Sequence, residues 1–311
     1  MAKILITESV HPIGPELLTA AGHTVVYADR DMDIIRREIV DADAVLVRII
    51  ELPGSLLTTA KNLKIVSKHG VGYDNIDLDY CKSHGIAVTI TPNANSLSVA
   101  EHAFTLMLTL AKNIIPVSNE YRTVGFAAKN HTPGIEMTGK TLGLIGMGRI
   151  GKYVLHMCKD GLDMHVIVYD PYISEVPEGV EKVDDLSELL RRADVVTLHC
   201  LLTDETRKLI DRERLALMKP TALLINCARG PIVDEDALIE ALENGRLAGA
   251  GLDVTDPEPV APDSPLFKLP NVIVTPHYAP TTVESATRVS KIAAENINAV
   301  LAGQEPVGRI V

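Results

Sequence analysis

The chain has 311 residues, with 30 Lys or Arg against 41 Asp or Glu, so its formal net charge is −11. This acidic balance excludes a uniformly basic surface for nucleic acid, although it leaves room for a local basic pocket. Hydrophobic residues make up 46% and charged residues 23% of the chain, which excludes a largely disordered, collagen-like or disulfide-scaffold protein. The chain is longer than a domain with a single small hydrophobic core, so its length indicates two domains.

The first third of the chain alternates short β-branched runs with helical patterns. The expected strands are Ile4–Thr7, Thr24–Tyr27, Ala44–Arg48, Lys64–Ser67 and Ala87–Ile90. The expected helices are Glu16–Ala21, Asp33–Val40, Ser55–Lys61 and Leu78–His84. Strands that alternate with helices in this way predict a parallel, doubly wound α/β sheet.

One long helical pattern follows over Ser98–Arg122. Ser98 and Glu101, three residues later, match a capping box at its start. The apolar residues of this segment cover more than one stripe. We therefore expect a helix that is buried on several sides, at a domain or subunit junction.

A second alternating series then begins. Its expected strands are Leu142–Ile145, His165–Tyr169, Val195–His199, Ala222–Asn226, Gly249–Val254 and Val272–Thr275. Its expected helices are Ile150–Lys159, Ser187–Arg192, Arg212–Leu217 and Glu235–Glu243, followed by a final helix at Val283–Leu301. The two series predict two α/β domains. We expect the final helix to return to the first domain, which would make that domain discontinuous.

The cysteines and the chain start indicate a cytoplasmic location. The four cysteines, Cys81, Cys158, Cys200 and Cys227, form no CxxC pair and are typical of small buried residues in a reducing compartment. The start, MAKILITE, leads directly into an expected strand and contains no secretion signal. The most apolar stretch, Val99–Ile115, is interrupted by charged residues. We expect no membrane contact, no nucleic acid and no metal.

The strongest local motif is GMGRIG at residues 146–151, between an expected strand and an expected helix. Gly146 would make a tight turn, Gly148 would let the backbone approach a pyrophosphate, and Gly151 would let helix and strand pack closely. The free N–H groups at the helix start attract phosphates, and Arg149 adds positive charge there. A lone GxGxxG is a weak signal, but strand and helix are both in place here.

Asp170 ends the next expected strand, 19 residues after Gly151. A carboxylate at this distance binds both ribose hydroxyls and repels a 2′-phosphate, and no Arg follows to favour one. The pattern favours NAD over NADP. The alternative is that Asp170 is only a turn residue before Pro171.

Three ionisable residues follow strands of the second series: Arg229, Glu258 and His277. In a doubly wound sheet, the carboxyl ends of the strands form the ligand crevice, so these side chains are expected to converge. Hydride transfer to a 2-oxo acid needs a proton donor, a carboxylate to orient it and a guanidinium to hold the substrate carboxylate, which His, Glu and Arg supply. Taken singly, each residue could instead belong to an ordinary strand end, surface turn or helix start.

Six segments carry a resemblance to a known family: TPNANSLSVAEHA, GKTLGLIGMGRIG, LTDETRKLI, MKPTALLINCARGPIVDEDAL, GAGLDVTDPEP and NVIVTPH. On these motifs the chain resembles the D-isomer-specific 2-hydroxyacid dehydrogenases, and within that family most resembles the D-3-phosphoglycerate dehydrogenases. The resemblance covers nearly the whole chain. It implies a Rossmann-type NAD-binding domain at residues 98–280, a flavodoxin-like substrate-binding domain at residues 1–97 and 281–311, and a cleft between them.

The resemblance also implies residue roles. Arg229 would anchor the substrate carboxylate, His277 would be the acid/base and Glu258 its partner, and Asp253 would contact the nicotinamide amide. The helix beginning near Ser98 would support a homodimer. The implied cofactor-binding residues are Gly146, Gly148, Arg149, Ile150, Gly151, Asp170, His199, Thr206, Cys227, Ala228 and Asp253, and the implied substrate-binding residues are Arg48, Val71, Gly72 and Arg229.

The identity of the substrate stays open between 3-phosphoglycerate and a small acid such as hydroxypyruvate or glyoxylate. Arg48 stands where phosphoglycerate dehydrogenases often have a substrate-side arginine, but Ile49-Ile50-Glu51 follows. These residues are apolar and acidic where a phosphate loop would prefer small polar ones. The chain ends nine residues after Ala302, so we expect no appended regulatory domain.

Two other hypotheses remain. One is a non-catalytic NAD(H)-sensing binding protein on the same fold, because fold alone does not decide function. The other is a formate dehydrogenase of the same superfamily, which is disfavoured because those enzymes carry Gln where Glu258 stands.

Overall fold

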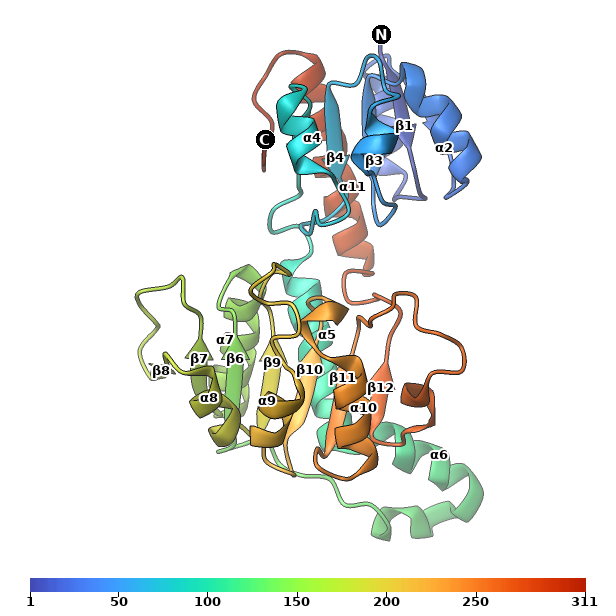
Figure 1. The fold of residues 1–311 in the computed structure, drawn as a ribbon. Helices are drawn as coiled ribbons and strands as arrows, with labels where there is room; N and C mark the ends of the chain where they lie inside the picture. The colour runs from blue at the N-terminus through green and yellow to red at the C-terminus, as the bar shows by residue number, and fades with distance from the viewer. The chain divides into compact units, whose positions relative to one another are not determined.

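The computed structural model describes residues 1–311, which divide into two compact units. Unit 1 comprises Met1–Asn95 and Pro280–Val311, and unit 2 comprises Ser96–Ala279 (Figure 1). The expected boundaries were after residues 97 and 280, whereas the structure places them after Asn95 and Ala279. Unit 1 is therefore built from both ends of the chain.

Unit 1 contains one parallel sheet of five strands, in the order β2-β1-β3-β4-β5. This is the flavodoxin-like order, which confirms the predicted doubly wound architecture. The strands are β1 (Lys3–Ile6), β2 (Thr24–Tyr27), β3 (Ala44–Val47), β4 (Ile65–Lys68) and β5 (Ala87–Thr89). The helices are α1 (Ile13–Ala20), α2 (Met32–Glu38), α3 (Gly54–Leu57), α4 (Leu78–Ser83) and α11 (Val283–Leu301), with a 3-10 turn η1 (Ile39–Asp41).

The last helix, α11, packs against α1 and β4 of unit 1. Its residues Ala293, Ala294 and Ile297 are fully buried in the core on that face of the sheet. A Cβ on Gly14 of α1 would lie 2.4 Å from the Ser290 hydroxyl oxygen of α11. The two helices therefore meet at a separation that only glycine allows.

Unit 2 contains a parallel sheet of seven strands, in the order β12-β11-β10-β9-β6-β7-β8 (Figure 1). The order reverses between β6 and β9, which is the Rossmann arrangement with β12 added at one edge. The strands are β6 (Thr141–Ile145), β7 (His165–Tyr169), β8 (Val180–Lys182), β9 (Val195–Leu198), β10 (Leu223–Asn226), β11 (Gly249–Leu252) and β12 (Val272–Val274). The sequence pattern missed β8, whose three residues at the sheet edge include Glu181 and Lys182.

Helices cover both faces of this sheet. Leu189 and Leu238 bury one face beneath α8 and α10, and Ala103 and Val154 bury the other beneath α5 and α7. The helices are α5 (Ser96–Ala111), α6 (Ile114–Val124), α7 (Arg149–Leu162), α8 (Leu186–Arg192), α9 (Arg212–Leu217) and α10 (Glu235–Glu243), and the 3-10 turns are η2 (Gly125–Asn130), η3 (Gly230–Ile232) and η4 (Pro265–Lys268). None of these helices or those of unit 1 combines the length and apolar character needed to cross a membrane.

The expectation of one helix over Ser98–Arg122 is wrong. The chain leaves α5 after Ala111, and Asn113 adopts a left-handed conformation with φ of 50° before α6 begins. Pro116 explains the break, because a proline lacks the backbone N–H and clashes with the carbonyl four residues earlier, so it is tolerated only in a first turn. Ser98 lies within α5 rather than at its cap, and its hydroxyl donates to the Ala279 carbonyl at 2.7 Å.

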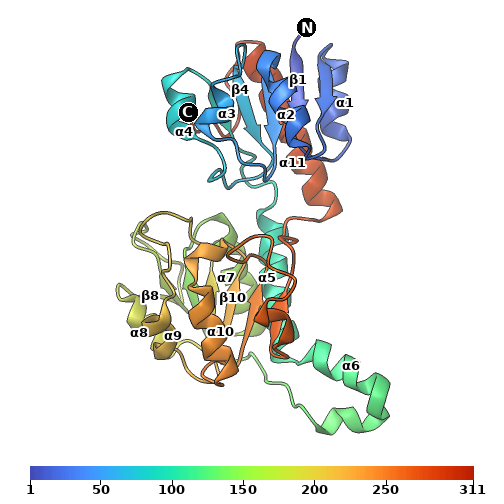
Figure 2. The ribbon, with the colours of Figure 1, turned by 45° about the vertical axis from the view of Figure 1, so that its right-hand side comes forward.

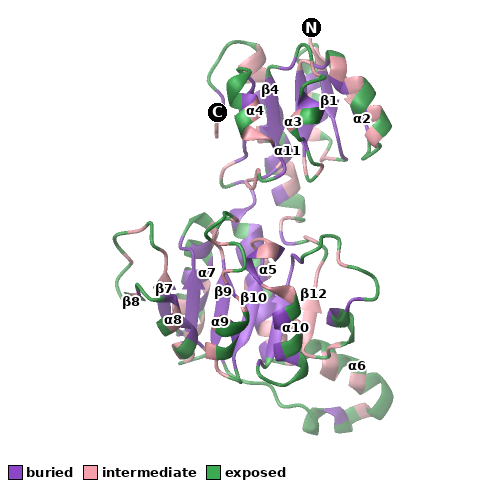
Figure 3. Ribbon diagram, viewed as in Figure 1, coloured by how far each residue is buried: buried purple, intermediate pink, exposed green.

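The two helices also differ in burial. α5 is buried against α7 and the sheet, as expected, whereas α6 has no buried residue (Figure 3). Figures 1 and 2 both show α6 and η2 projecting from the body of unit 2. Ile114, Tyr121 and Phe126 are more than half exposed on this projecting segment, which we call the arm (residues 112–135).

Candidate active site

The GMGRIG segment forms the turn between β6 and α7. Gly146 has a φ of 88°, and a Cβ there would lie 2.8 Å from the backbone N of Cys200. A Cβ on Gly151 would lie 2.3 Å from the carbonyl oxygen of Gly146. By contrast, a Cβ on Gly148 would meet nothing within 4 Å. The loop is thus closely packed beneath an open space at Gly148, which fits the approach of a pyrophosphate to the start of α7. Arg149 and Ile150 form the first turn of that helix.

This loop lies where the strand order reverses, the usual ligand position in a doubly wound sheet. His199 follows β9 there, and its Nε2 lies 2.8 Å from the Thr197 hydroxyl. Its Nδ1 is buried without a hydrogen-bond partner, and burial lowers the pKa of His199 to about 3. Farther along the same loop, the Thr206 hydroxyl donates to the Leu201 carbonyl at 2.6 Å. His199 and Thr206 therefore shape the loop that borders the glycine turn.

Asp170 follows β7 and is held beside the glycine loop. One carboxylate oxygen accepts the Met147 N–H at 2.9 Å, and the other accepts the Tyr172 N–H at 3.0 Å. The Tyr172 hydroxyl donates to Glu205 at 2.7 Å, and this bond raises the pKa of Tyr172. Glu205 therefore brings a second carboxylate to the same region, which the sequence patterns did not indicate.

The segment after β10 presents Arg229. Its preceding residues Cys227 and Ala228 leave the strand end, where the Asn226 side chain accepts the Ala228 N–H at 3.0 Å and donates to the Arg229 carbonyl at 2.9 Å. A Cβ on Gly230 would lie 1.9 Å from the Thr255 carbonyl oxygen. The Arg229 segment therefore packs directly on the loop after β11 that leads to Glu258.

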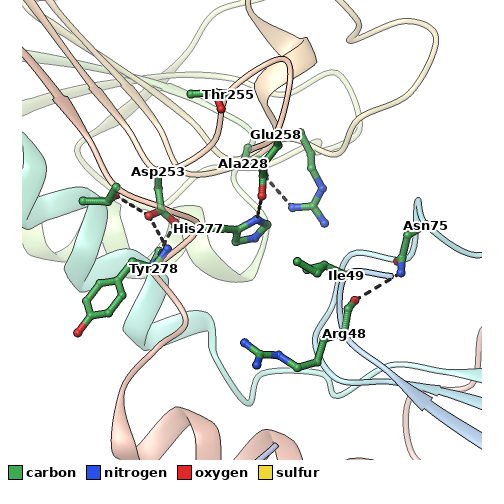
Figure 4. A network of polar contacts seen from close by, with 12 residues as sticks. Arg48, Ile49, Asn75, Ala228, Asp253, Thr255, Glu258, His277 and Tyr278 are labelled. Carbon is green, nitrogen blue, oxygen red and sulfur yellow. Dashed lines mark hydrogen bonds and ion pairs between the residues drawn. The ribbon is translucent and has the colours of Figure 1, made fainter. Parts of the chain in front are cut away.

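Glu258 and His277 are brought together from the loops that follow β11 and β12. His277 Nδ1 lies 2.7 Å from Glu258 Oε1, and about a third of each side chain is exposed (Figure 4). Because a carboxylate only accepts, Nδ1 carries the hydrogen and Nε2 is the ring atom left for a substrate. This geometry fits an orienting carboxylate with an acid/base histidine.

Asp253 is almost fully buried at the end of β11. Its carboxylate accepts the N–H groups of Tyr278 at 2.7 Å and Ala279 at 2.9 Å, and the hydroxyl of Thr275 at 2.6 Å (Figure 4). Its backbone carbonyl accepts the N–H of His277 at 2.8 Å. Asp253 therefore holds the segment that carries His277, a role not anticipated from the sequence.

The other predicted site residues lie in unit 1. Arg48 follows β3, and its side chain donates to the Ser9 carbonyl at 2.9 Å. The buried carboxylate of Glu8 accepts the successive N–H groups of Arg48, Ile49 and Ile50 at 2.7–3.4 Å. Glu8 was not singled out from the sequence.

Val71 and Gly72 lie in the loop after β4, and their substrate-binding roles stay predictions. Lys68, at the end of that strand, is buried and donates to Asn75 Oδ1 at 2.6 Å and to the Arg48 carbonyl. Asn75 donates in turn to the Ile50 carbonyl at 2.7 Å. This network ties the Arg48 loop to the loop that follows β4.

Comparison with known proteins identifies relatives of both units. Residues 104–279 match the family model described as D-isomer specific 2-hydroxyacid dehydrogenase, NAD binding domain. The chain is 43% identical over 308 residues to a D-3-phosphoglycerate dehydrogenase of Methanocaldococcus jannaschii, and the match covers 98% of this chain but only 58% of that protein. It is 38% identical over 319 residues to a glyoxylate reductase of Thermofilum pendens, covering 98% of this chain and 93% of that protein.

A solved structure agrees with these matches. The D-lactate dehydrogenase of Aquifex aeolicus, complexed with NAD and lactic acid, superposes with a TM-score of 0.87 at 32% sequence identity. The superposition covers 96% of this chain and 96% of that one. The present structure therefore resembles that enzyme over nearly the full length of both chains.

Proposed function

Because the chain belongs to the D-isomer specific 2-hydroxyacid dehydrogenase family, we propose that it is an NAD-dependent oxidoreductase acting on a D-2-hydroxy acid or its 2-oxo partner. The observation that supports this most directly is the contact of 2.7 Å between His277 Nδ1 and Glu258 Oε1. Glu258 and His277 follow β11 and β12, which belong to the same sheet as β6, and the glycine loop follows β6. Parallel strands present their carboxyl ends on one edge, so nucleotide loop and acid/base pair share that edge.

The proposed chemistry assigns a separate task to each side chain. Bound NAD(H) supplies the hydride exchanged with carbon 2 of the substrate. In the reducing direction, His277 Nε2–H donates a proton to the substrate carbonyl oxygen, and Glu258 holds the ring through Nδ1 and stabilises its positive charge. Arg229 binds the substrate carboxylate through its guanidinium.

The surroundings of Asp170 support NAD rather than NADP. Its two oxygens are held by the Met147 and Tyr172 N–H groups, beside the glycine loop. Glu205, fixed by the Tyr172 hydroxyl, adds a second negative charge on this side. A 2′-phosphate would meet two carboxylates here, whereas ribose hydroxyls could donate to them.

The interactions of Glu8 favour a substrate without a phosphate group. Three successive backbone N–H groups, of Arg48, Ile49 and Ile50, would form an anion-binding concavity. The Glu8 carboxylate, whose Oε1 also lies 3.8 Å from Arg30 Nε, already occupies it as the bound anion. Since the Arg48 loop is predicted to border the substrate, we infer that this chain prefers a small 2-oxo acid, such as glyoxylate or hydroxypyruvate, over its phosphorylated counterpart.

The exposed arm supports the predicted homodimer. α6 is a helix of 11 residues without a buried side chain, and such a short helix is marginal in water by itself. Tyr121 and Phe126 line an apolar groove of about 400 Å³ along it. We propose that a second copy covers this groove in a symmetric dimer. We also propose a cytoplasmic location, because Cys81, Cys158, Cys200 and Cys227 all lack a disulfide partner.

The direct test is NADH oxidation with a panel of 2-oxo acids. Turnover of a small 2-oxo acid that is lost in His277→Asn supports the enzyme. Tight NADH binding without turnover of any acid would support the alternative, a non-catalytic NAD(H)-sensing protein.

A further inference from the structure

His102, on α5, contacts the network that holds the His277 segment. Its Nε2 lies 3.0 Å from the Thr275 hydroxyl and 3.4 Å from the nearer oxygen of Asp253. Only 16% of its side chain is exposed, and its ring meets the Tyr278 ring edge-on, with centroids 6.1 Å apart. His102 is therefore fixed on two sides by the segment that carries His277.

The direction of these hydrogen bonds follows from their donors. The single hydroxyl hydrogen of Thr275 is directed to Asp253, which can only accept, at 2.6 Å. Thr275 must therefore accept from His102, so His102 Nε2 carries a hydrogen. The result is a chain of donors that runs from His102 through Thr275 to Asp253.

The hydrogen bond from Thr275 to Asp253 matters because Asp253 in turn holds the backbone next to His277. His277 has a φ of 52°, in the left-handed region that a residue other than glycine rarely adopts because its Cβ crowds the backbone there. The Asp253 carboxylate compensates by accepting the next two N–H groups, of Tyr278 and Ala279. A rotation of this carboxylate would release the backbone that directs the His277 ring toward Glu258.

We propose that His102 and Thr275 are positioning residues for His277, acting through Asp253; the catalytic part of this proposal rests on the proposed function. Neither residue reaches the reacting atoms. His102 fixes the Thr275 hydroxyl, Thr275 fixes the Asp253 carboxylate, and Asp253 holds the His277 segment in its left-handed conformation. Helix α5 thus contributes to the active site through His102.

The test compares His102→Leu, which removes the donor, with His102→Gln, whose side-chain amide keeps an N–H at similar reach. We expect His102→Leu to lower kcat by about 10- to 100-fold, because small misplacements of a catalytic group have such effects. His102→Gln should recover most of kcat. Thr105→Val, which removes a hydroxyl bonded only within α5, is the matched control and should leave kcat unchanged.

A double-mutant cycle tests whether His102 acts through Thr275. If it does, Thr275→Val should lower kcat about as much as His102→Leu, and the double variant should lose little more than either one. If the fold-loss of kcat in the double variant equals the product of the two single losses, the proposed chain is overturned. It is also overturned if His102→Leu keeps the kcat of the unmodified protein, or if His102→Gln loses as much kcat as His102→Leu.

Amide hydrogen exchange separates this proposal from the proposed function, because it needs no turnover. His102→Leu should speed exchange at the Tyr278 and Ala279 N–H groups, and His102→Gln should restore their protection. Unchanged exchange in His102→Leu would overturn the positioning role even in an active enzyme. Failure of the unmodified protein to turn over any 2-oxo acid would instead overturn the proposed function.

Discussion

Glu258 Oε1 lies 2.7 Å from Nδ1 of His277, although 19 residues separate the two in the sequence. Glu258 follows β11, His277 follows β12, and these two strands are hydrogen-bonded neighbours in the sheet. The pair thus depends on the parallel register of β11 and β12. It leaves His277 Nε2 as the ring atom available to exchange a proton with a substrate.

Replacing Glu258 with Gln should weaken catalysis without unfolding the protein. Glu258→Gln keeps the shape of the side chain but removes the charge that stabilises the protonated ring, so we expect kcat to fall by about 100-fold or more. Steady-state NADH oxidation measures this loss. Glu243→Gln, at an exposed glutamate of α10, is the control, and a comparable loss there would contradict a specific role for Glu258.

Two glycines of the nucleotide loop should respond differently to alanine. The Cβ added by Gly148→Ala would meet nothing within 4 Å, and Gly148 has an ordinary φ of −72°, so the melting temperature should stay unchanged. Because this Cβ would enter the space expected for the pyrophosphate, NADH binding should weaken at least about tenfold. Gly151→Ala places a Cβ 2.3 Å from the Gly146 carbonyl, so the free energy of unfolding should fall by about 1–3 kcal/mol.

Thermal unfolding and NADH titration of both variants check this contrast. Unchanged NADH affinity in Gly148→Ala would show that the open space over this residue is not the pyrophosphate site. An unaltered melting temperature in Gly151→Ala would contradict the close contact between α7 and the end of β6.

The sequence predicted what depends on local pattern. The strand and helix alternation, the glycine turn and the positions of Arg229, Glu258 and His277 after strands are all visible as short motifs. The contact between Glu258 and His277 follows from one general rule, that parallel strands present their carboxyl ends on one edge. The break at Asn113 was also readable in principle, because Pro116 forbids a continuous helix.

The remaining features depend on contacts between distant segments. His102 lies in an apolar helical pattern, where a histidine is indistinguishable from an ordinary core residue until α5 is seen to pack beside β12. Glu8 likewise becomes informative only when β1 and β3 are paired, which brings its carboxylate to the Arg48 N–H. No short motif encodes either pairing.

Acid should destabilise the protein through His199. Burial lowers the pKa of His199 to about 3 in the folded chain, whereas the unfolded side chain titrates near 6.5. Between these values the unfolded chain binds the extra proton, so the stability from a neutral His199 is present above pH 6.5 and is lost as pH falls toward 3. At about pH 5 this loss amounts to about 2 kcal/mol.

Urea unfolding at neutral and acidic pH measures the effect. From neutral to acidic pH, the free energy of unfolding should fall less in His199→Phe than in the unmodified protein. In His165→Phe, which changes an exposed histidine, it should fall as much as in the unmodified protein. Equal losses in all three proteins would mean that His199 is not held neutral by the fold.

The arm should control the oligomeric state. Tyr121→Glu with Phe126→Glu introduces charges into the apolar groove, so we expect light scattering to report dimers for the unmodified protein and monomers for the double variant. Thr123→Glu adds a charge at an exposed arm residue outside the groove and should leave the dimer intact. A monomeric unmodified protein would contradict the proposed interface.

The most direct measurement is the rate of NADH oxidation with glyoxylate, hydroxypyruvate and phosphohydroxypyruvate, for the unmodified protein and for His277→Asn. We predict turnover with a non-phosphorylated acid, a lower kcat/KM for the phosphorylated one, and a loss of kcat of about 100-fold or more in the variant, whose NADH affinity is retained. Equal turnover by the two proteins would contradict the role of His277. Tight binding of NADH without its oxidation by any of these acids would contradict the proposed oxidoreductase activity.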